Sequence, residues 1–347
     1  ITYKMDMKNQ LSSIKALFRF RIYTIINIIG LAVSVAATLI IVRYIHQELT
    51  VDHFCKNLNQ LYILTAQRSN GGISIIDNAD RNDPNFIDPM KNPEVEGYSY
   101  GISYKDDYII YDEHRYRVNV LVTDSLFLQL MDYPVISGIK TIQRPDDAII
   151  TRQYAKHLWG DEEPLGRQFV SSAGYTLTIR GVVDEPDTKS SLQFDLITPV
   201  NQGKYMDWTR MGFCIARLAK GTELKSFNEK ISKPQSLICF GHSPIQFRLL
   251  PLKELYFDKV VSSESSFFLR GNKEHITVLS IVACMLLLVG IFNFINIYTV
   301  IILKRAREFG VKKVYGASGI HRFYIKRHLK KQYLCIIPSL FQIRECI

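Results

Sequence analysis

The apolar residues of this chain concentrate in two long stretches. Residues 22–42 and 276–303 contain no Asp, Glu, Lys or Arg. A helix needs about 20 mostly apolar residues to cross the hydrocarbon core of a bilayer. The pattern therefore predicts two transmembrane helices, at residues 22–45 and 276–303.

The region between these stretches, residues 46–275, is predicted to form an α+β domain. Short β-branched and aromatic runs predict strands, and they lie at residues 108–111, 117–122, 148–151, 175–183 and 245–250. Helices are expected at 123–131, 151–158 and 222–231. Strands and helices do not alternate regularly, so we expect a mixed α/β domain between two membrane helices, built as one unit or two subdomains.

Charge is distributed unevenly along the 347 residues. The formal charge of +10 and mean hydropathy of +0.01 resemble those of a basic soluble protein. However, residues 1–21 carry +4, residues 304–347 carry +9 and the segment between them carries −3. Basic flanks lie on the cytoplasmic side of membrane helices, so both ends are expected in the cytoplasm and residues 46–275 on the opposite side.

The basic ends and the first apolar run admit several interpretations. They abut apolar runs and contain no zinc-finger spacing, so no nucleic-acid partner is expected. The first apolar run is longer than that of a signal peptide and lacks a small-x-small cleavage site, which favours an uncleaved anchor. Residues 1–21 fit a basic amphipathic helix in the membrane interface, with an ordinary positive flank as the alternative.

Small and polar residues inside the two spans predict helix packing. Gly30 and Ser34 belong to a series of small residues in the first span, and Asn293 and Asn296 share one face of the second. Small residues let membrane helices approach closely, and buried amides bond between helices. We expect these four residues to pack helices together rather than to line a transport pathway.

The sequence offers little sign of catalysis. It contains no GxxxxGK[ST], HExxH or CxxC, and its histidines are scattered, so no catalytic residue, metal site or cofactor is expected. Residues 97–101 match GxSxG, but a strand-like run follows where a nucleophile elbow needs a helix, which indicates an accidental match. Of the cysteines, Cys214 and Cys239 are the natural candidates for one disulfide, with free buried thiols as the alternative.

Several segments together resemble permease subunits of ABC transporters of the MacB/FtsX-like type, in the form common in Bacteroidetes. The first follows the first span, and the most specific follows the second. They are residues 48–54 with 61–64, 154–166, 179–186 with Phe194 and Asp195, Phe292–Asn296, and 304–317. The resemblance covers nearly the whole chain.

The resemblance implies a function in which this chain performs no covalent chemistry. A separate cytoplasmic ABC ATPase would drive a permease dimer in the bacterial inner membrane, and the motion would reach a periplasmic domain, residues 46–275. Export, lipoprotein release or activation of an envelope partner are the implied outputs, with a periplasmic or outer-membrane partner left open. The implied ATPase-coupling residues are Arg307, Glu308, Gly310, Val311, Lys312, Lys313, Gly316 and Ala317.

The segment after the second span, residues 304–347, departs from the family. Such permeases have at least four spans, whereas residues 334–343 are too short to cross a membrane and contain Pro338. We therefore expect an aborted third span in a C-terminally incomplete chain, or a second chain that supplies the remaining spans. A two-span membrane scaffold, or a protein resembling polysaccharide chain-length regulators, is the alternative function.

Overall fold

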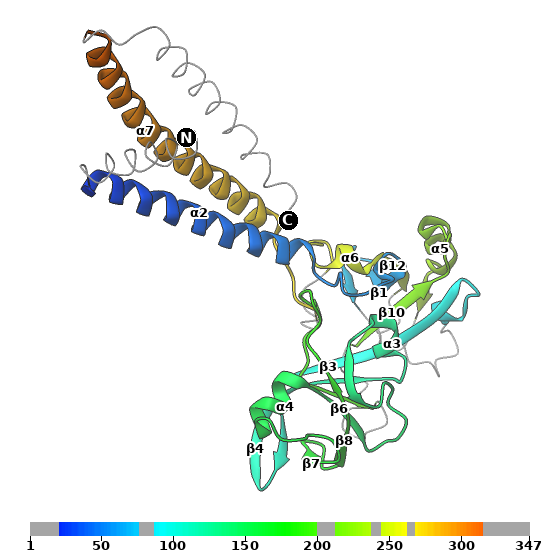
Figure 1. The fold of residues 1–347 in the computed structure, drawn as a ribbon. Coiled ribbons are helices and arrows are strands. Elements are labelled where there is room, and N and C mark those ends of the chain that lie inside the picture. The colour runs from blue at the N-terminus through cyan, green and yellow to red at the C-terminus, as the bar shows by residue number, and fades with distance from the viewer. Residues whose placement is uncertain (1–20, 76–86, 200–211, 237–243, 262–267, 315–347) are drawn as a thin grey trace. The chain divides into compact units, whose positions relative to one another are not determined.

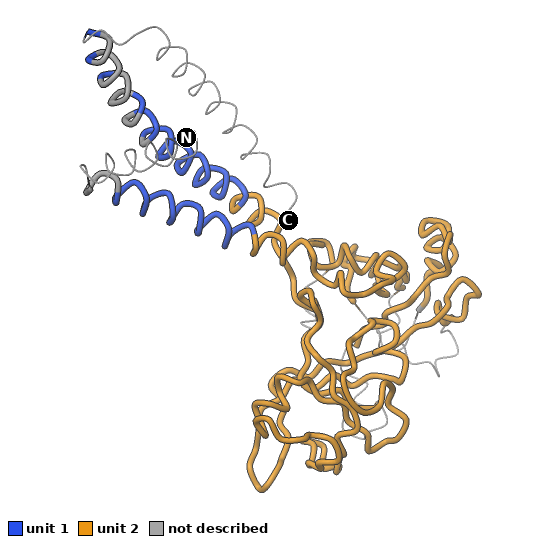
Figure 2. Tube along the Cα trace, in the orientation of Figure 1, with its two compact units in different colours: residues 1–42, 280–347 blue, residues 43–279 orange. Residues whose placement is uncertain are grey.

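The computed structural model describes residues 21–75, 87–199, 212–236, 244–261 and 268–314. The chain divides into two compact units (Figure 2). One comprises residues 1–42 and 280–347, and the other residues 43–279. The predicted interfacial helix before residue 21, the predicted third span and Cys239 lie outside the described residues.

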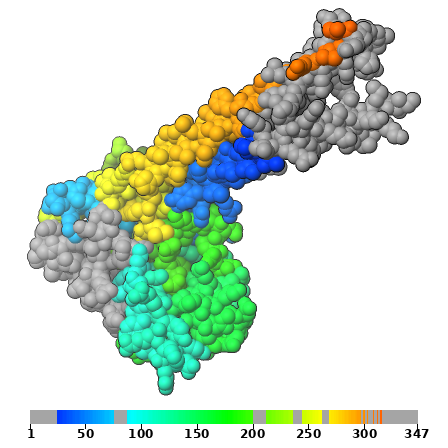
Figure 3. Space-filling view, turned by 90° about the vertical axis from the view of Figure 1, so that its left-hand side faces the viewer, coloured from blue at the N-terminus to red at the C-terminus, as the bar shows by residue number. Residues whose placement is uncertain are grey.

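Two long helices carry the apolar stretches. Helix α2 spans Arg21–Leu49 and helix α7 spans Lys273–Val314 (Figure 1). Both are long and apolar enough to cross a membrane. Large apolar side chains such as Ile26 and Ile40 are 62% and 70% exposed, which is unfavourable in water and typical of a surface that faces lipid. The space-filling view shows side chains of both helices on the surface (Figure 3).

The described part of residues 43–279 forms a twelve-stranded mixed sheet. Ten strands follow in the order β11-β12-β1-β10-β3-β4-β9-β6-β8-β5, while β2 pairs with β1, and β7 with β3 and β8. The bounds are β1 Leu61–Arg68, β2 Ile73–Ile75, β3 Val95–Tyr111, β4 His114–Thr123, β5 Val135–Gly138, β6 Asp147–Thr151, β7 Gln168–Ser171, β8 Thr176–Val183, β9 Leu196–Pro199, β10 Phe213–Leu218, β11 Gln235–Ser236 and β12 Pro244–Pro251.

Most strand pairs are antiparallel, but β4 pairs with β9 and β6 with β8 in parallel. Strands β3, β4, β6 and β12 contain four of the five runs predicted from alternation and β-branched content, and β8 covers the fifth from its second residue on. The expected α+β class, with a mixed sheet domain between two apolar helices, is therefore confirmed.

Three short helices, α3, α4 and α5, lie within or next to the predicted ranges, whereas a fourth, α6, was not predicted. Helix α3 spans Phe127–Met131, α4 Arg152–Trp159, α5 Leu224–Ile231 and α6 Leu252–Leu255, with 3-10 turns at Leu58–Gln60 and Pro89–Lys91. Helix α4 begins where the Thr151 side chain accepts a hydrogen bond from the Tyr154 amide, an N-cap of the usual kind. The apolar faces of α4 and α5 bury Trp159 and Phe227.

Buried side chains among the described residues form three hydrophobic clusters. The largest includes Leu61, Phe127, Tyr133 and Phe213 and connects several elements of the domain. A second surrounds Trp159 of α4, and a third lies under α5 and β12. Cys55 belongs to the first cluster and donates a hydrogen bond to the Met131 carbonyl, while burial raises the pKa of its thiol. Cys214 is fully buried in β10.

The GxSxG match lies inside strand β3, not at a turn from strand to helix. The Ser99 hydroxyl is buried and donates to the Asp124 carboxylate at 2.8 Å. Gly101 lies beside the Phe213 ring, and a Cβ added there would come within 2.4 Å of the ring carbon Cζ. These residues serve the packing of the sheet, as the sequence interpretation of an accidental match expects.

Replacing Gly101 with alanine should destabilise the domain, because the added methyl forces the buried Phe213 ring to move. We expect a cost of about 1–3 kcal/mol, the range for overpacked cores. Gly97→Ala is the matched control on the same strand, since its Cβ would lie 3.7 Å from Leu130 in ordinary contact. Thermal unfolding of the two detergent-solubilised variants measures the difference, and equal midpoints would contradict the packing assignment.

Candidate functional site

The predicted ATPase-coupling segment lies in the last turns of α7. Arg307, Glu308, Gly310, Val311, Lys312 and Lys313 all fall within this helix, while Gly316 and Ala317 lie outside the described residues. The Arg307 and Val311 side chains are exposed and, four residues apart, share one face of the helix. Helix α7 is continuous for 42 residues, so one helix contains both the second apolar stretch and this basic segment.

Three of the four predicted packing residues meet where α2 and α7 contact each other. The Asn293 amide donates to the Asn27 carbonyl at 2.6 Å, and a Cβ on Gly30 would lie 3.1 Å from Asn293 Nδ2. Ser34 is buried and lies against Gly290 of α7. Glycine thus permits the close approach that the interhelical hydrogen bond needs.

Asn296, three residues along α7, is exposed. Of the two asparagines, Asn293 therefore contacts α2, while Asn296 remains exposed. Packing of helices by all four residues stays a prediction.

A cluster of polar side chains lies at the end of α2 that enters the sheet domain. The Lys189 ammonium lies 2.6 Å from the Glu48 carboxylate and donates to the Tyr256 hydroxyl at 2.9 Å. The Tyr256 hydroxyl in turn donates to the second Glu48 oxygen at 2.5 Å. The Glu48 and Lys189 side chains are only 8% and 25% exposed, so little water competes with these bonds.

Asp52, which follows the end of α2, also belongs to this cluster. Its carboxylate accepts from the Ser191 amide at 2.8 Å and from the Ser190 hydroxyl at 3.3 Å. Its own amide donates to the Lys189 carbonyl at 2.8 Å. Asp52 has a φ of 62°, in the left-handed region where Asp and Asn are enriched among non-glycine residues. We call Glu48, Asp52, Lys189 and Tyr256 the junction cluster.

The ionisation of the junction cluster follows from its geometry. Burial opposes the charged form of Lys189, but hydrogen bonds with Glu48 and Tyr256 outweigh it and raise the pKa of the ammonium. Burial also raises the pKa of the Asp52 carboxyl, despite the hydrogen bonds from Ser191 and Ser190. Lys189 is thus held as a cation, whereas ionisation of the Asp52 carboxyl is less favourable than that of an exposed carboxyl.

Sequence reasoning noted Glu48 and Asp52 as parts of a family-like segment but missed their partners. Lys189 lies 141 positions from Glu48, and Tyr256 lies 208 positions from it. Lys189 stands in a polar run, residues 187–191, that reads as an ordinary loop. No local pattern signals that this lysine is partly buried, so only the fold brings the cluster together.

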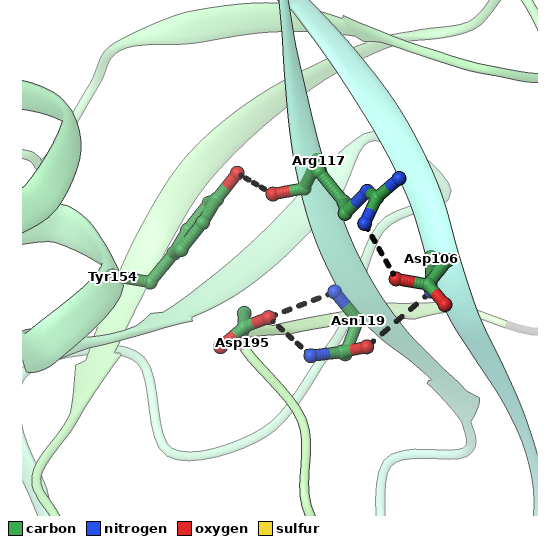
Figure 4. Close-up of polar contacts among 5 residues, drawn as sticks. All are labelled: Asp106, Arg117, Asn119, Tyr154 and Asp195. Carbon is green, nitrogen blue, oxygen red and sulfur yellow. Dashed lines mark hydrogen bonds and ion pairs between the residues drawn. The ribbon is translucent and has the colours of Figure 1, made fainter.

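Two other family-like segments have structural explanations. The Asp195 carboxylate accepts from the backbone amide and the side-chain amide of Asn119, both at 2.8 Å, and so holds β4 to the start of β9 (Figure 4). In the same view Tyr154 donates to the Arg117 carbonyl at 2.7 Å. At Gly181, a Cβ would lie 2.6 Å from the Ile139 carbonyl oxygen, so glycine permits the close approach of the chain there.

The part of the chain that the structure describes contains no group of three or more His, Cys, Asp or Glu side chains placed to hold an ion. The polar clusters that do occur join chain segments to one another.

Comparison with known proteins identifies the family. The model for the MacB-like periplasmic core domain matches residues 24–233. Comparison with curated protein sequences finds no match.

Three solved structures illustrate the similarity. A domain of a putative permease protein from Porphyromonas gingivalis is 17% identical with a TM-score of 0.46, over 57% of this chain and 91% of that chain. The periplasmic region of MacB from Actinobacillus actinomycetemcomitans is 11% identical with a TM-score of 0.40, over 57% and 94%. The extracellular domain of the noncanonic ABC-type transporter YknZ from Gram-positive bacteria is 15% identical with a TM-score of 0.39, over 55% and 99%.

The family match covers more than half of the chain and runs from the first apolar helix through α5 of the sheet domain. The mixed sheet and the apolar helices before and after it agree with this assignment. The chain therefore belongs to the family of MacB-like periplasmic core domain proteins, which are ABC-type transporter permeases.

Proposed function

We propose that this chain is the membrane subunit through which a separate cytoplasmic ATPase moves a periplasmic domain. ATP binding and hydrolysis belong to the ATPase, and no catalytic residue is assigned to this chain. The motion would serve export, lipoprotein release or activation of an envelope partner. A permease dimer in the bacterial inner membrane, with both chain ends in the cytoplasm, is part of the proposal.

The observation that carries the proposal is the continuity of α7. This helix runs from Lys273, beside the sheet domain, through the second apolar stretch to the basic turns at Arg307–Lys313. A helix resists bending over such a length, since each turn is held by backbone hydrogen bonds. A push at its basic end is therefore transmitted along the helix to the segment that joins the sheet domain.

The proposed domain boundaries match the roles given above to the membrane helices, the periplasmic domain and the coupling segment. We propose a basic cytoplasmic segment at 1–21, membrane helices at 22–45 and 276–303, a periplasmic domain at 46–275, and a cytoplasmic coupling segment from residue 304. In the coupling segment we propose that Glu308 and Lys312 contact the ATPase, because side chains four residues apart on a helix present one shared face.

Replacing Glu308 and Lys312 together with alanine should weaken binding of the ATPase. Loss of two charged contacts at an interface costs about 1–3 kcal/mol, which corresponds to a roughly 5- to 150-fold lower affinity. The measurement is vanadate-sensitive ATP hydrolysis that co-purifies with the affinity-tagged full-length chain from source-cell membranes. The Lys225→Ala variant, altered at an exposed residue of the sheet domain, is the control. Unchanged ATPase recovery with the double variant would contradict the coupling assignment.

A further inference from the structure

One loop of the sheet domain connects the chain after α2 with the chain that leads into α7. We call residues 188–192, which follow β8 and precede β9, the junction loop. Its Thr188 hydroxyl accepts from the Phe54 amide at 3.0 Å, and its Lys189 carbonyl accepts from the Asp52 amide at 2.8 Å. On the α2 side, the loop is therefore bound to backbone as well as to the Glu48 and Asp52 carboxylates.

The same loop is bound to the segment before α7. The Ser191 carbonyl accepts from the Leu269 amide at 2.6 Å, and Leu192 forms a β-bridge with Phe268. The Phe268 ring packs against the Phe213 ring of β10, with the ring centroids 5.1 Å apart. Four residues of chain separate Phe268 from Lys273, where α7 begins.

Tyr256 also contacts the segment that leads into α7. Its carbonyl accepts from the Gly271 amide at 2.8 Å, and its ring lies so close to Gly271 that an added Cβ would come within 2.2 Å of ring carbon Cε1. The hydroxyl of the same residue bonds both Glu48 and Lys189. Tyr256 thus contacts Glu48 at the end of α2, Lys189 in the junction loop, and Gly271 in the segment just before α7.

The junction loop is anchored in the core, not merely at the surface. Tyr133, buried in the largest hydrophobic cluster, makes a 2.7 Å hydrogen bond with the Ser190 hydroxyl and donates to the Leu192 carbonyl. Phe54 packs on the Tyr133 ring with the centroids 5.0 Å apart. The junction loop is therefore bound directly to a residue of the core.

We infer, on the basis of the function proposed above, that the junction cluster is the joint through which α2 and α7 move the sheet domain. Lys189 and Tyr256 are its positioning residues. The Lys189 cation holds the Glu48 carboxylate of α2 to the junction loop, and Tyr256 connects both to the approach to α7. Movement of either helix end then displaces the same loop, and through it β9, as one body.

The test uses the full-length chain with its co-purifying ATPase, reconstituted in lipid vesicles. Hydrogen exchange of residues 192–199 is measured without nucleotide and with ATP plus vanadate, in samples with equal bound ATPase. With Lys189→Met we expect the nucleotide-dependent change in exchange to fall at least about fivefold, as for loss of a coupling contact. Lys189→Arg, which keeps the cation, should retain most of the change, and Lys225→Met, at an exposed lysine, should retain all of it.

Tyr256→Phe provides a second variant that keeps the ring against Gly271 and removes only the shared hydroxyl. It should also reduce the nucleotide-dependent change, with exchange in the absence of nucleotide unaltered elsewhere in the domain. A full nucleotide response in both Lys189→Met and Tyr256→Phe would overturn the joint while leaving the proposed function intact. If these variants raise exchange throughout the domain even without nucleotide, the cluster only maintains the fold, and the proposed joint is also overturned. No nucleotide response in the unsubstituted complex would overturn the proposed function, and the joint with it.

Discussion

Replacing Glu48 with alanine is expected to lower the free energy of unfolding of the sheet domain by about 2–4 kcal/mol. The substitution leaves the Lys189 ammonium partly buried, with the Tyr256 hydroxyl as its one remaining hydrogen-bond partner among the described residues. Removing one member of a buried ion pair costs about 3–5 kcal/mol when the remaining charge is isolated. The residual exposure of Lys189 and its bond to Tyr256 place the expected value toward the lower end.

Glu48→Gln separates the charge of this residue from its hydrogen bonds. Glutamine keeps the side-chain length and can accept from Lys189, so its cost should be clearly smaller than that of alanine. Glu229→Ala is the matched control, since Glu229 is an exposed glutamate near the end of α5. Pulse proteolysis of the membrane-inserted chain across a urea series measures all three. A Glu48→Ala midpoint equal to that of Glu229→Ala would show that the ion pair contributes nothing.

Replacing Asp52 with alanine is expected to cost a similar amount, about 2–4 kcal/mol, for two separate reasons. The Ser191 amide, at a residue 1% exposed, loses its acceptor, and an unsatisfied buried donor costs about 1–3 kcal/mol. The left-handed backbone at position 52 adds roughly 1 kcal/mol for alanine, which lacks the polar side chain that Asp and Asn use there.

Asp52→Asn should leave the free energy of unfolding nearly unchanged, because asparagine keeps the hydrogen-bond acceptor and tolerates a positive φ.

The Asp52 carboxyl should also make stability depend on pH. Burial raises the pKa of Asp52, so folding favours its protonated form. The contribution of this carboxyl to stability is therefore fully present at low pH and is lost as the pH rises through the raised pKa. Asparagine removes this dependence. The same urea series, run at acidic and neutral pH, checks both points, and equal losses for Ala and Asn would contradict the assignment.

The membrane helices and many of the strands were accessible from sequence because their signals are local. The uncharged runs predict α2 and α7, and alternation in residues 117–122 predicts β4. Strand β10 escaped prediction, since the run Phe213–Leu218 is buried at most positions and therefore does not alternate. A short buried run of this kind does not by itself distinguish a strand from part of a helix.

The candidate site shows a different limit. Asn293 was singled out because an amide is unusual within an apolar run, and it does bond to the neighbouring helix. Lys189 gave no such signal, because a lysine in a polar loop is normally solvated. Its partial burial depends on Glu48 and Tyr256, which lie 141 and 67 positions away in the chain. Pairings of this range cannot be read from local pattern.

If ATP-driven motion reaches the sheet domain through this chain, as we propose, binding of nucleotide to the ATPase should alter that domain. We would measure hydrogen exchange of residues 43–279 in the unsubstituted, vesicle-reconstituted complex, with and without ATP plus vanadate. We expect a nucleotide-dependent change that includes the junction loop and β9. ATP hydrolysis by the bound ATPase with no change in exchange anywhere in residues 43–279 would contradict it.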